Sequence, residues 1–261
     1  MTPRELREKK LKALQEQKFQ PHQRISNNFI NSAILDLNKN ALKTVFYLST
    51  ILDEFNFKKD MDTIEIDLRK MFKHTGLTAD IVKDNLKAMQ KTSITFVNEK
   101  EEIEEFIVLV PRIEFLYGQN KVRIDIYSKI AKLIIDVKDN YQYTPMNIKT
   151  ILGLTNKHSF RLLPVLNMLS RYDAHIGKRK KYSLADMNDM FGTSYKTLYE
   201  IKRKILDPVK EELDNGSTIS FTYQVNSEKL GAGRPKDTSI TIDVIEKNHY
   251  QAKLFLSLIH I

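Results

Sequence analysis

The sequence predicts an α+β fold that contains two tandem modules of the same kind, and three observations support this prediction. With 261 residues, of which 41% are hydrophobic, the chain is long enough for two ordinary domains with buried cores. Apolar residues recur at helical spacing in some segments and alternate with polar residues in others. The order helix, strand, helix, helix and β-hairpin occurs twice along the chain. Because this is the order of a winged helix, we expect two winged-helix domains, preceded by a basic N-terminal helix.

The first predicted element is a charged helix over residues 2–20. Thr2 can cap it, Pro3 suits its first position, and Glu5 completes a capping box. Its apolar stripe is too thin for a core helix, so we expect an arm that is mobile or that a partner orders. Its basic side chains could contact phosphates, although a solvated tail is the simpler interpretation.

Capping signals mark the helices of the first module. Asp67 begins one helix, Gly76 ends it, and Thr78 caps the next. A turn near Gly118 precedes the last strand, and residues 24–32 are expected to be irregular or strand-like. The predicted elements are a helix over 41–55, a strand over 63–68, helices over 67–76 and 79–91, strands near 94–97, 106–110 and 121–127, and a helix over 128–137.

The second module follows a break at Pro145, near which we place the domain boundary. Gly192 is expected to form a tight turn, and Ser194 to cap the helix that follows. Segment 67–72 (DLRKMF) resembles segment 186–191 (DMNDMF), which favours two copies of one module. The predicted elements are helices over 159–172, 184–191, 195–206 and 208–213, and strands over 180–183, 218–225 and 238–245.

The charge balance is strongly basic. Lys and Arg number 42 against 33 Asp and Glu, which gives a net charge of +9 and an isoelectric point near 9.4. A surplus of this size favours a polyanionic partner, most often nucleic acid, although an ordinary basic protein can also carry it. The charge therefore indicates nucleic acid only in combination with the placement of the basic residues.

The helix over 195–206 is the expected DNA-reading helix of the second module. Leu198, Ile201 and Ile205 recur at spacings of three and four and should face the core, which turns a basic and aromatic face outward. Arg203 can donate two hydrogen bonds to a guanine edge. Alone, such a face would suit solvent equally well. The expected DNA contacts on this helix and at its start are Thr193, Ser194, Tyr195, Lys196, Tyr199, Lys202 and Arg203.

Two further basic features flank this helix. Residues 178–181 are four consecutive cations, and among them Lys180 and Lys181 are expected DNA contacts. Residues 229–236 form a basic, glycine-containing loop between two strands, where a wing would lie. Its Arg234 suits a narrow minor groove, and Lys236 is a further expected contact. Three basic features in one module predict double-stranded DNA as the ligand.

The first module carries a weaker signal. Lys83, Lys87 and Lys91 form a stripe on the helix that corresponds to the reading helix, but two aspartates dilute it. The hairpin around 99–105 is rich in glutamate and should repel a phosphate backbone. We therefore expect this module to provide a secondary DNA contact through Lys83 and Lys87, a protein interface, or both in turn.

No residue pattern predicts catalysis, a metal site or a cofactor. The chain has no cysteine, which excludes disulfides and thiolate metal sites and fits a cytoplasmic protein. Its six histidines are scattered, without a metal-ligand spacing or the His-hydrophobic-His pattern of a nicking enzyme. The loop 231–235 lacks the glycine-lysine-serine/threonine ending of a phosphate-binding P-loop. We expect no membrane span, because no apolar run is long enough, and no secretory leader.

A basic pair, Lys202-Arg203, precedes Leu206-Asp207-Pro208, and the acidic pair Glu211-Glu212 lies near the end of the next predicted helix. With segments 182–187 and 191–196, and with Gly233-Arg234 in the loop, this pattern resembles the iteron-binding plasmid replication initiators of the RepB/RepE type. Segment 160–172 is similar to the helix that opens the second module of that family. The resemblance is specific in the second module and only architectural in the first.

The resemblance implies two winged-helix domains that bind repeated sites at a plasmid origin as a monomer. It also implies a homodimer, formed through the first domain, that often represses its own promoter at an operator, and host replication proteins as further partners. We therefore expect a helical arm over 1–24, a first winged-helix domain over 25–140, a second, DNA-reading domain over 141–250, and a tail over 251–261.

Two alternatives remain open at this point. One is a winged-helix transcription regulator without a role in replication, and a more distant one is a nicking or priming enzyme. The tail raises a separate question, because residues 256–261 (LSLIHI) resemble the translation of a sequencing adapter. We hypothesise that they are an artefact of sequence assembly, the alternative being a short apolar strand or docking tail.

Overall fold

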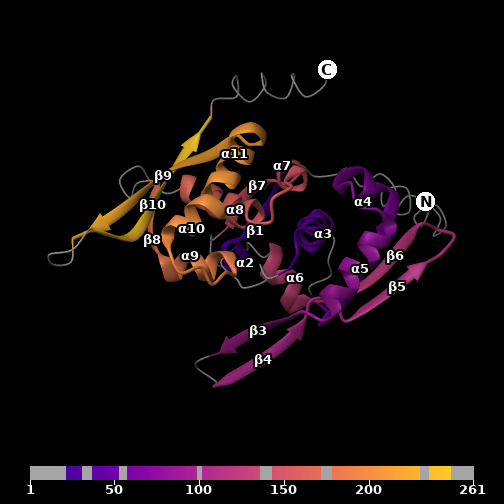
Figure 1. The fold of residues 1–261 in the computed structure, drawn as a ribbon. Coiled ribbons are helices and arrows are strands. Elements are labelled where there is room, and N and C mark those ends of the chain that lie inside the picture. Colours follow the sequence, from indigo (N-terminus) through magenta and orange to yellow (C-terminus); the bar gives the residue numbers. More distant parts are fainter. Residues whose placement is uncertain are drawn as a thin grey trace, which may run out of the picture.

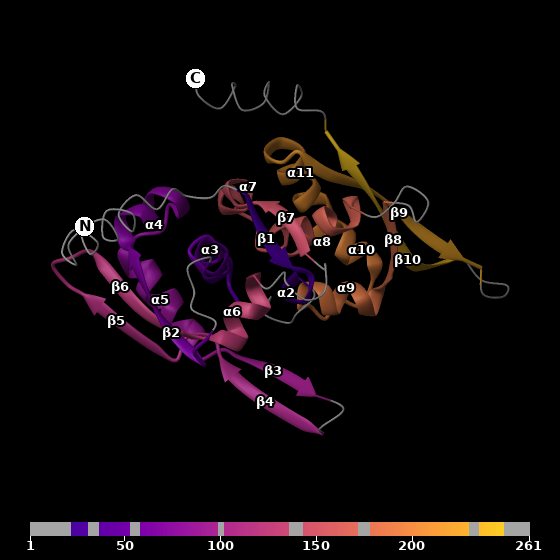
Figure 2. The same ribbon diagram turned by 180° about the vertical axis from the view of Figure 1, so that it is seen from behind.

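The computed structural model describes residues 22–30, 37–52, 58–98, 102–135, 143–171, 178–229 and 235–247. Within them, the expected α+β fold with two winged-helix modules is confirmed, and the modules lie side by side in Figures 1 and 2. The predicted N-terminal arm, the part of the basic loop that holds Arg234, and the C-terminal tail lie outside the described residues.

The first module packs three helices against a three-stranded antiparallel sheet with the strand order β2-β6-β5. Its helix ends are set as predicted: the Asp67 side chain accepts hydrogen bonds from two N–H groups, and Gly76 adopts a left-handed φ of 68°. Thr78 caps the next helix. The first helix is shorter than predicted and ends at Ser49. The elements are α3 (Lys39–Ser49), β2 (Met61–Asp67), α4 (Leu68–Thr75), α5 (Ala79–Gln90), β5 (Arg112–Leu116) and β6 (Lys121–Tyr127).

The wing of the first module differs from the predicted one. The sequence predicts three strands after α5, but the structure has four, because β5 precedes β6 and forms a hairpin with it. Strands β3 (Ser93–Asn98) and β4 (Ile103–Val108), the second of which carries Glu104 and Glu105, form a separate two-stranded sheet, which projects from the body in Figure 1. The wing is therefore the β5–β6 hairpin, and the acidic hairpin is an addition to the winged helix.

A central group of elements joins the modules. β1 (His22–Ser26) pairs antiparallel with β7 (Tyr143–Asn147), which follows the expected domain boundary. Pro145 lies within β7 and has no N–H to donate to a neighbouring strand. Because the β1–β7 sheet has only two strands, one edge of β7 has no strand beside it, and proline is tolerated on such an edge strand. The remaining members are α2 (Asn27–Ile30), α6 (Ser128–Ile135) and α7 (Ile148–Gly153), of which α7 is not predicted from the sequence.

The second module repeats the arrangement with the antiparallel strand order β8-β10-β9. Ser183 and Asp186 form a capping box at the start of α9, and Gly192, with a φ of 58°, ends that helix as predicted. The elements are α8 (Ser159–Ser170), β8 (Arg179–Ser183), α9 (Leu184–Phe191), α10 (Leu198–Ile201), the π-helical turn η3 (Lys202–Leu206), α11 (Asp207–Gly216), β9 (Ile219–Glu228) and β10 (Lys236–Glu246).

The reading helix begins three residues later than predicted. The expected cap at Ser194 is wrong: Thr197 caps α10, and its hydroxyl accepts a hydrogen bond from the Glu200 N–H at 3.2 Å. Pro208 lies in the first turn of α11, which begins one residue before the predicted start of that helix, and α10, η3 and α11 follow one another without a gap. We use the name reading helix for these three elements together.

The π-helical turn has a cause in the sequence. Pro208 has no N–H, and in a regular α-helix its ring would clash with the carbonyl four residues before it. The helix accommodates the proline by widening just ahead of it, so that the Asp207 N–H donates to the carbonyl of Lys202, five residues back.

α8 is the core helix of the whole molecule. Most of its residues are buried, as expected for a helix that is largely apolar on every side. It packs against α2 and β7 in the central group and against α11, β9 and β10 in the second module. One cluster of buried hydrophobic residues extends through both modules. The modules therefore share a core and are not joined by a linker alone.

Candidate nucleic-acid interface

One side chain holds the turn between α9 and the reading helix. Asn188 accepts hydrogen bonds from the Tyr195 N–H and the Thr193 hydroxyl and donates one to the Tyr195 carbonyl, each at 2.9 Å. Gly192 reverses the chain just before. Thr193 and Tyr195 are half-buried by these contacts, whereas Ser194 is exposed. The expected contacts Thr193 and Ser194 thus lie in a fixed turn and not at the helix end.

Glu200 occupies the N-terminus of the reading helix. Its carboxylate accepts hydrogen bonds from the Lys196 N–H at 3.2 Å and from Lys204 Nζ at 2.9 Å. The hydrogen bond from Lys204 is the main reason why the pKa of Glu200 lies below its usual value, and the Lys196 N–H adds to it. A phosphate that approaches this helix end therefore meets a carboxylate beside the free N–H groups.

The outer face of the reading helix is aromatic and basic. Tyr199 is 62% exposed, and the guanidinium carbon of Arg203 lies 5.9 Å from the centre of its ring. Lys204 Nζ lies 4.7 Å from the centre of the Tyr195 ring. Such cation–π contacts position the cations without removing their charge. Arg203 and Lys196 are exposed, and Lys202 is half-buried. All the contacts predicted between residues 193 and 203 therefore lie on the turn after α9 or on the reading helix that follows it.

The basic run 178–181 is partly neutralised within the protein. Its first two cations form ion pairs at 2.6 Å with Glu246 and Asp243 of β10. Lys180 and Lys181 are exposed on β8. The two cations predicted as contacts thus remain available to a ligand, while the other two stabilise the sheet.

β9 and β10 continue beyond β8 as a two-stranded ribbon, which extends from the second module in Figure 1. Lys236 is exposed on this ribbon, opposite Glu228. The Asn226 amide donates to the hydroxyls of Ser239 and Thr241 across the ribbon, at 3.1 and 2.9 Å. These bonds stiffen the base of the basic loop, whose Arg234 lies outside the described residues.

The two predicted contacts of the first module lie far from this surface, because Figures 1 and 2 place α5 and α10 toward opposite ends of the molecule. Lys83 contacts its own wing: its Nζ donates to the Tyr117 hydroxyl at 3.2 Å. Lys87 is exposed. Two cations of this wing, Lys121 and Arg123, pair with Glu65. The wing of this module therefore presents less unpaired positive charge than the β9–β10 ribbon of the second module within the described residues.

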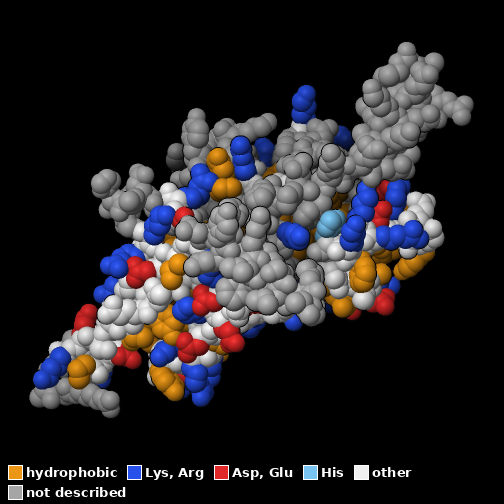
Figure 3. Space-filling view, turned by 90° about the horizontal axis from the view of Figure 1, so that it is seen from above, with side chains coloured by type: hydrophobic (Ala, Val, Ile, Leu, Met, Phe, Trp, Pro, Cys, Tyr) orange, Lys and Arg blue, Asp and Glu red, His pale blue; other side chains and the backbone are white. Residues whose placement is uncertain are grey.

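The wider surface has mixed charge. Viewed from above, in Figure 3, Lys and Arg side chains are spread along the molecule with Asp and Glu side chains among them. No helix in the described ranges is long and apolar enough to cross a membrane. The same ranges contain no group of three or more His, Cys, Asp or Glu residues that could hold a metal ion.

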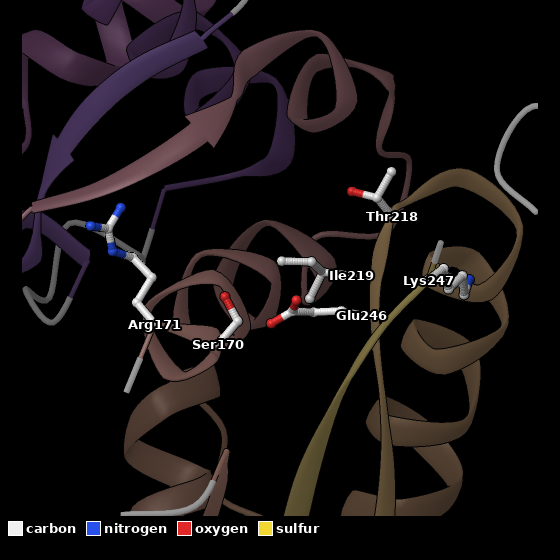
Figure 4. A pocket seen from close by; sticks show the side chains of 6 residues that line it. All are labelled: Ser170, Arg171, Thr218, Ile219, Glu246 and Lys247. Atoms are coloured by element: carbon white, nitrogen blue, oxygen red, sulfur yellow. The ribbon is translucent and has the colours of Figure 1, made fainter. Parts of the chain in front are cut away.

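A pocket of about 410 Å³ lies between the end of α8 and the sheet of the second module, as Figure 4 shows. Glu246, which lines it, pairs with Lys178 at 2.6 Å. Lys247 donates to the carbonyls of Leu213 and Asp214 at the end of α11. Because Glu246 and Lys247 are already engaged by the protein and the third charged group, Arg171, stacks over the Tyr143 ring, we do not assign this pocket as a ligand site. The lining residues are Ser170, Arg171, Thr218, Ile219, Glu246 and Lys247.

The sequence pattern misses Asn188 and Thr197 as parts of this interface and gives Glu200 no role. The sequence does contain a signal for Thr197 and Glu200. A threonine followed three residues later by a glutamate is a capping-box pattern, which marks the start of a helix. Asn188 has no comparable signal, because its hydrogen-bond partners are defined only by the turn that it closes.

Comparisons with known proteins give two family matches. Residues 23–167 match a family model described as Initiator Replication protein, WH1, and residues 183–243 match one described as Initiator Rep protein, WH2. No curated protein matches. Among solved structures, the chain is similar to the Pi initiator protein, described in a crystal structure in complex with iteron DNA. The TM-score is 0.69 at 14% identity, over 89% of this chain and 99% of that chain, so the likeness shows the fold.

Proposed function

Because the chain belongs to the family of initiator replication proteins, we propose that it initiates replication of a plasmid by binding repeated double-stranded DNA sites at the origin. The first family model covers the first module, the central group and most of α8, and the second covers residues 183–243 of the second module. The Pi initiator, which shares the fold, is described in complex with iteron DNA. We therefore propose that the sites of this chain are iterons, each bound by a monomer.

The observation that carries this proposal is the outer face of the reading helix. A helix in the major groove places side chains against base edges, and the second helix of a helix-turn-helix does so with its N-terminal part. Lys196, Tyr199 and Arg203 are exposed in that part of the module. Arg203 can donate two parallel hydrogen bonds to a guanine, which distinguishes a base and not merely a phosphate.

The remaining predicted contacts suit the DNA backbone. We propose that the exposed cations of β8 and of the β9–β10 ribbon neutralise phosphates, and that Arg234 enters the minor groove. The exposed Ser194 hydroxyl can donate to a phosphate oxygen, whereas the Thr193 hydroxyl already donates to Asn188 and would have to exchange that bond for one to DNA. The first module would add a secondary contact. The residues concerned are Lys180, Lys181 and Lys236 for phosphates, Thr193 and Ser194 in the turn, and Lys83 and Lys87 in the first module.

The test is whether the gene, with the DNA that flanks it, sustains a plasmid that lacks its own origin. We expect the intact gene to maintain the plasmid and Arg203→Ala to lose it at equal protein level. Lys210→Ala is the matched control, since it removes a cation of the same helix that is already paired with Asp214. Failure of the intact gene, together with tight binding to a single operator, would favour the alternative, a transcription regulator without a replication role.

The acidic hairpin favours a further role for the first module, as a dimer interface. Among the described strands, β3 and β4 pair only with each other, so each presents an edge to which another strand can add. Phe106 on β4 is 65% exposed. We propose that a homodimer forms through this hairpin, represses the promoter at an operator, and exchanges with the origin-binding monomer.

The hairpin's role predicts the effect of Phe106→Glu. Two glutamates brought together across an interface repel each other, so the dimer fraction in sedimentation velocity should fall. The affinity of the monomer for a single repeat should stay unchanged, because Phe106 is not among the proposed DNA contacts. A dimer fraction equal to that of the wild type would contradict this role of the hairpin.

We further propose that the chain acts by binding and not by catalysis. The family models describe initiators of replication and name no enzymatic activity. The enzymatic steps of replication would then be carried out by host replication proteins in the cytoplasm, where plasmid DNA lies. A metal-dependent nick in supercoiled origin DNA, produced by the purified chain, would overturn this part of the proposal.

A further inference from the structure

Glu212 lies at the point where the two modules meet. It belongs to α11, roughly 13 Å beyond Arg203 along the reading helix. Its Oε1 accepts hydrogen bonds from the N–H and the hydroxyl of Thr155, each at 2.6 Å, and from the Asn156 N–H at 3.2 Å. Thr155 and Asn156 form the corner between α7 and α8. One carboxylate thus ties the reading helix to this corner.

The corner is connected to both modules. α7 packs against α3, α4 and β1, whereas α8 packs against α11 and the strands of the second sheet. Lys43 on α3 lies within the electrostatic reach of the same carboxylate: burial lowers the pKa of Lys43, Lys39 lowers it further, and the charge of Glu212 opposes both. Because α3 also packs against α5, a movement at Glu212 would be transmitted to the helices of the first module.

Two other contacts fasten the start of α8, which follows this corner, to the helix-turn-helix. The buried Arg161 of α8 donates from Nη1 to the carbonyl of Met190 at 3.0 Å, near the end of α9. The ring of His158 packs edge-on against Phe191, with 5.4 Å between ring centres. Both contacts act on the end of α9 that leads into the turn held by Asn188. The start of α8 therefore holds α9, and the corner just before it holds the reading helix through Glu212.

We propose that Glu212 is a positioning residue that fixes the reading helix relative to the first module, so that both modules contact one DNA site in a fixed phase. This inference rests on the proposed function, because it requires DNA contacts from both modules. A carboxylate that accepts several hydrogen bonds holds its partners more tightly than a neutral acceptor does. Two linked contacts strengthen binding only when their geometry allows both at once.

The experiment compares the affinity of the full chain for two duplexes. One is the complete site, as footprinted with the wild type, and the other keeps only the part that the second module protects. The wild type should prefer the complete site. Glu212→Ala should lower this preference roughly tenfold while leaving the affinity for the short duplex unchanged.

Two further variants separate positioning from general stability. Glu212→Gln keeps an oxygen that can accept from Thr155 but loses the charge, so it should restore part of the preference for the complete site. Glu211→Ala makes the same charge change at the exposed neighbouring position and should behave as the wild type. If Glu212→Ala does not fold, Thr155→Val removes one donor of the same contact and should lower the preference by a smaller factor.

Several results would overturn the inference. An equal loss on both duplexes would mean that Glu212 only stabilises the second module. An unchanged preference in both Glu212→Ala and Thr155→Val, or a wild type that binds the two duplexes equally, would exclude a positioning role. A wild type that binds no repeated site would instead refute the proposed function, and this inference with it.

Discussion

Arg203 and Tyr199 lie together on the outer face of the reading helix, and Lys204 is shared between the Tyr195 ring and the Glu200 carboxylate. The residues proposed to touch DNA are thus held by neighbours before any ligand arrives. Ordering a long cationic side chain costs free energy on binding, so such contacts reduce that cost. At the residue scale, the interface consists of cations together with the aromatic and acidic side chains that position them.

Arg203→Ala should weaken binding to a repeat by about 1–3 kcal/mol if Arg203 contacts a guanine. The base preference should relax at one position of the site, as measured by competition with singly substituted duplexes. If Arg203 contacts only a phosphate, the loss should be uniform across sequences and the salt dependence shallower. An affinity equal to that of the wild type would show that the helix is not placed in the groove as proposed.

His158 predicts a loss of stability in mild acid. Burial lowers the pKa of His158 to about 4, with smaller contributions from the charges of Lys157 and Arg161, and its Nδ1 has no hydrogen-bond partner among the described residues. The unfolded chain, with an ordinary histidine pKa, takes up a proton below about pH 6.5, whereas the folded chain does not until about pH 4. The unfolded state is therefore favoured increasingly as the pH falls through this window.

The predicted contribution is about 2 kcal/mol of unfolding free energy lost between pH 7.5 and pH 5. Urea unfolding of the wild type and of His158→Gln at both pH values isolates it, since other titrating groups are common to the two chains. The variant should lose about 2 kcal/mol less than the wild type over this interval. Equal losses would mean that His158 is accessible to protons in the folded state.

At the element scale, the sequence predicts helix ends well where a side chain caps them. Asp67, Gly76, Thr78 and Gly192 all stand where the structure ends or begins a helix, because caps are local and have few alternatives. Strand β5 is missed although Ile113 and Phe115 alternate with charged residues, since strand pairing depends on contacts far away in the chain.

The site is predictable to a similar degree. Helical spacing places the cations of the reading helix on its outer face, as the structure has them. Which cations are neutralised follows instead from strand register: the pairing of β8 with β10 sets Arg179 opposite Asp243. The sequence alone does not define that register, so it does not distinguish the two ion-paired cations of the run 178–181 from the two that remain available to a ligand.

The π-helical turn predicts the behaviour of Pro208→Ala. An alanine supplies the missing N–H and removes the ring clash, so the helix can close to a regular α-helix and rotate Lys202, Arg203 and Lys204 relative to α11. Thermal unfolding should show unchanged or increased stability. The affinity for a repeat should fall by about 1–3 kcal/mol if one base contact is misplaced. Unchanged affinity would mean that the turn only accommodates the proline.

At the scale of the whole molecule, the two modules share α8 as a core but differ in the charge of their wings. The wing cations of the first module are paired with carboxylates, whereas Lys236 on the β9–β10 ribbon of the second module forms no ion pair within the described residues. The second module should therefore dominate the electrostatic part of binding. The first module would then make a weaker contact with DNA and form the proposed dimer.

Binding should depend steeply on salt. Lys180, Lys181, Lys196 and Lys236 are exposed and form no ion pair in the part of the chain that the structure describes. If each neutralises one phosphate, the plot of log affinity against log salt should have a slope of roughly −4. Replacing Lys180 and Lys181 with alanine should make the slope shallower by about 2. Lys178→Ala, which removes a cation already paired with Glu246, is the control and should leave it nearly unchanged.

The most direct measurement for the proposed initiator is a hydroxyl-radical footprint of the full chain on the DNA that flanks its gene. A monomer with two winged-helix modules in fixed phase should protect each member of a set of direct repeats in the same way, with protected stretches on one side of the duplex. Arg203→Ala should lose this protection at equal protein concentration. Protection of a single palindromic operator alone, or of no defined site, would contradict the proposal.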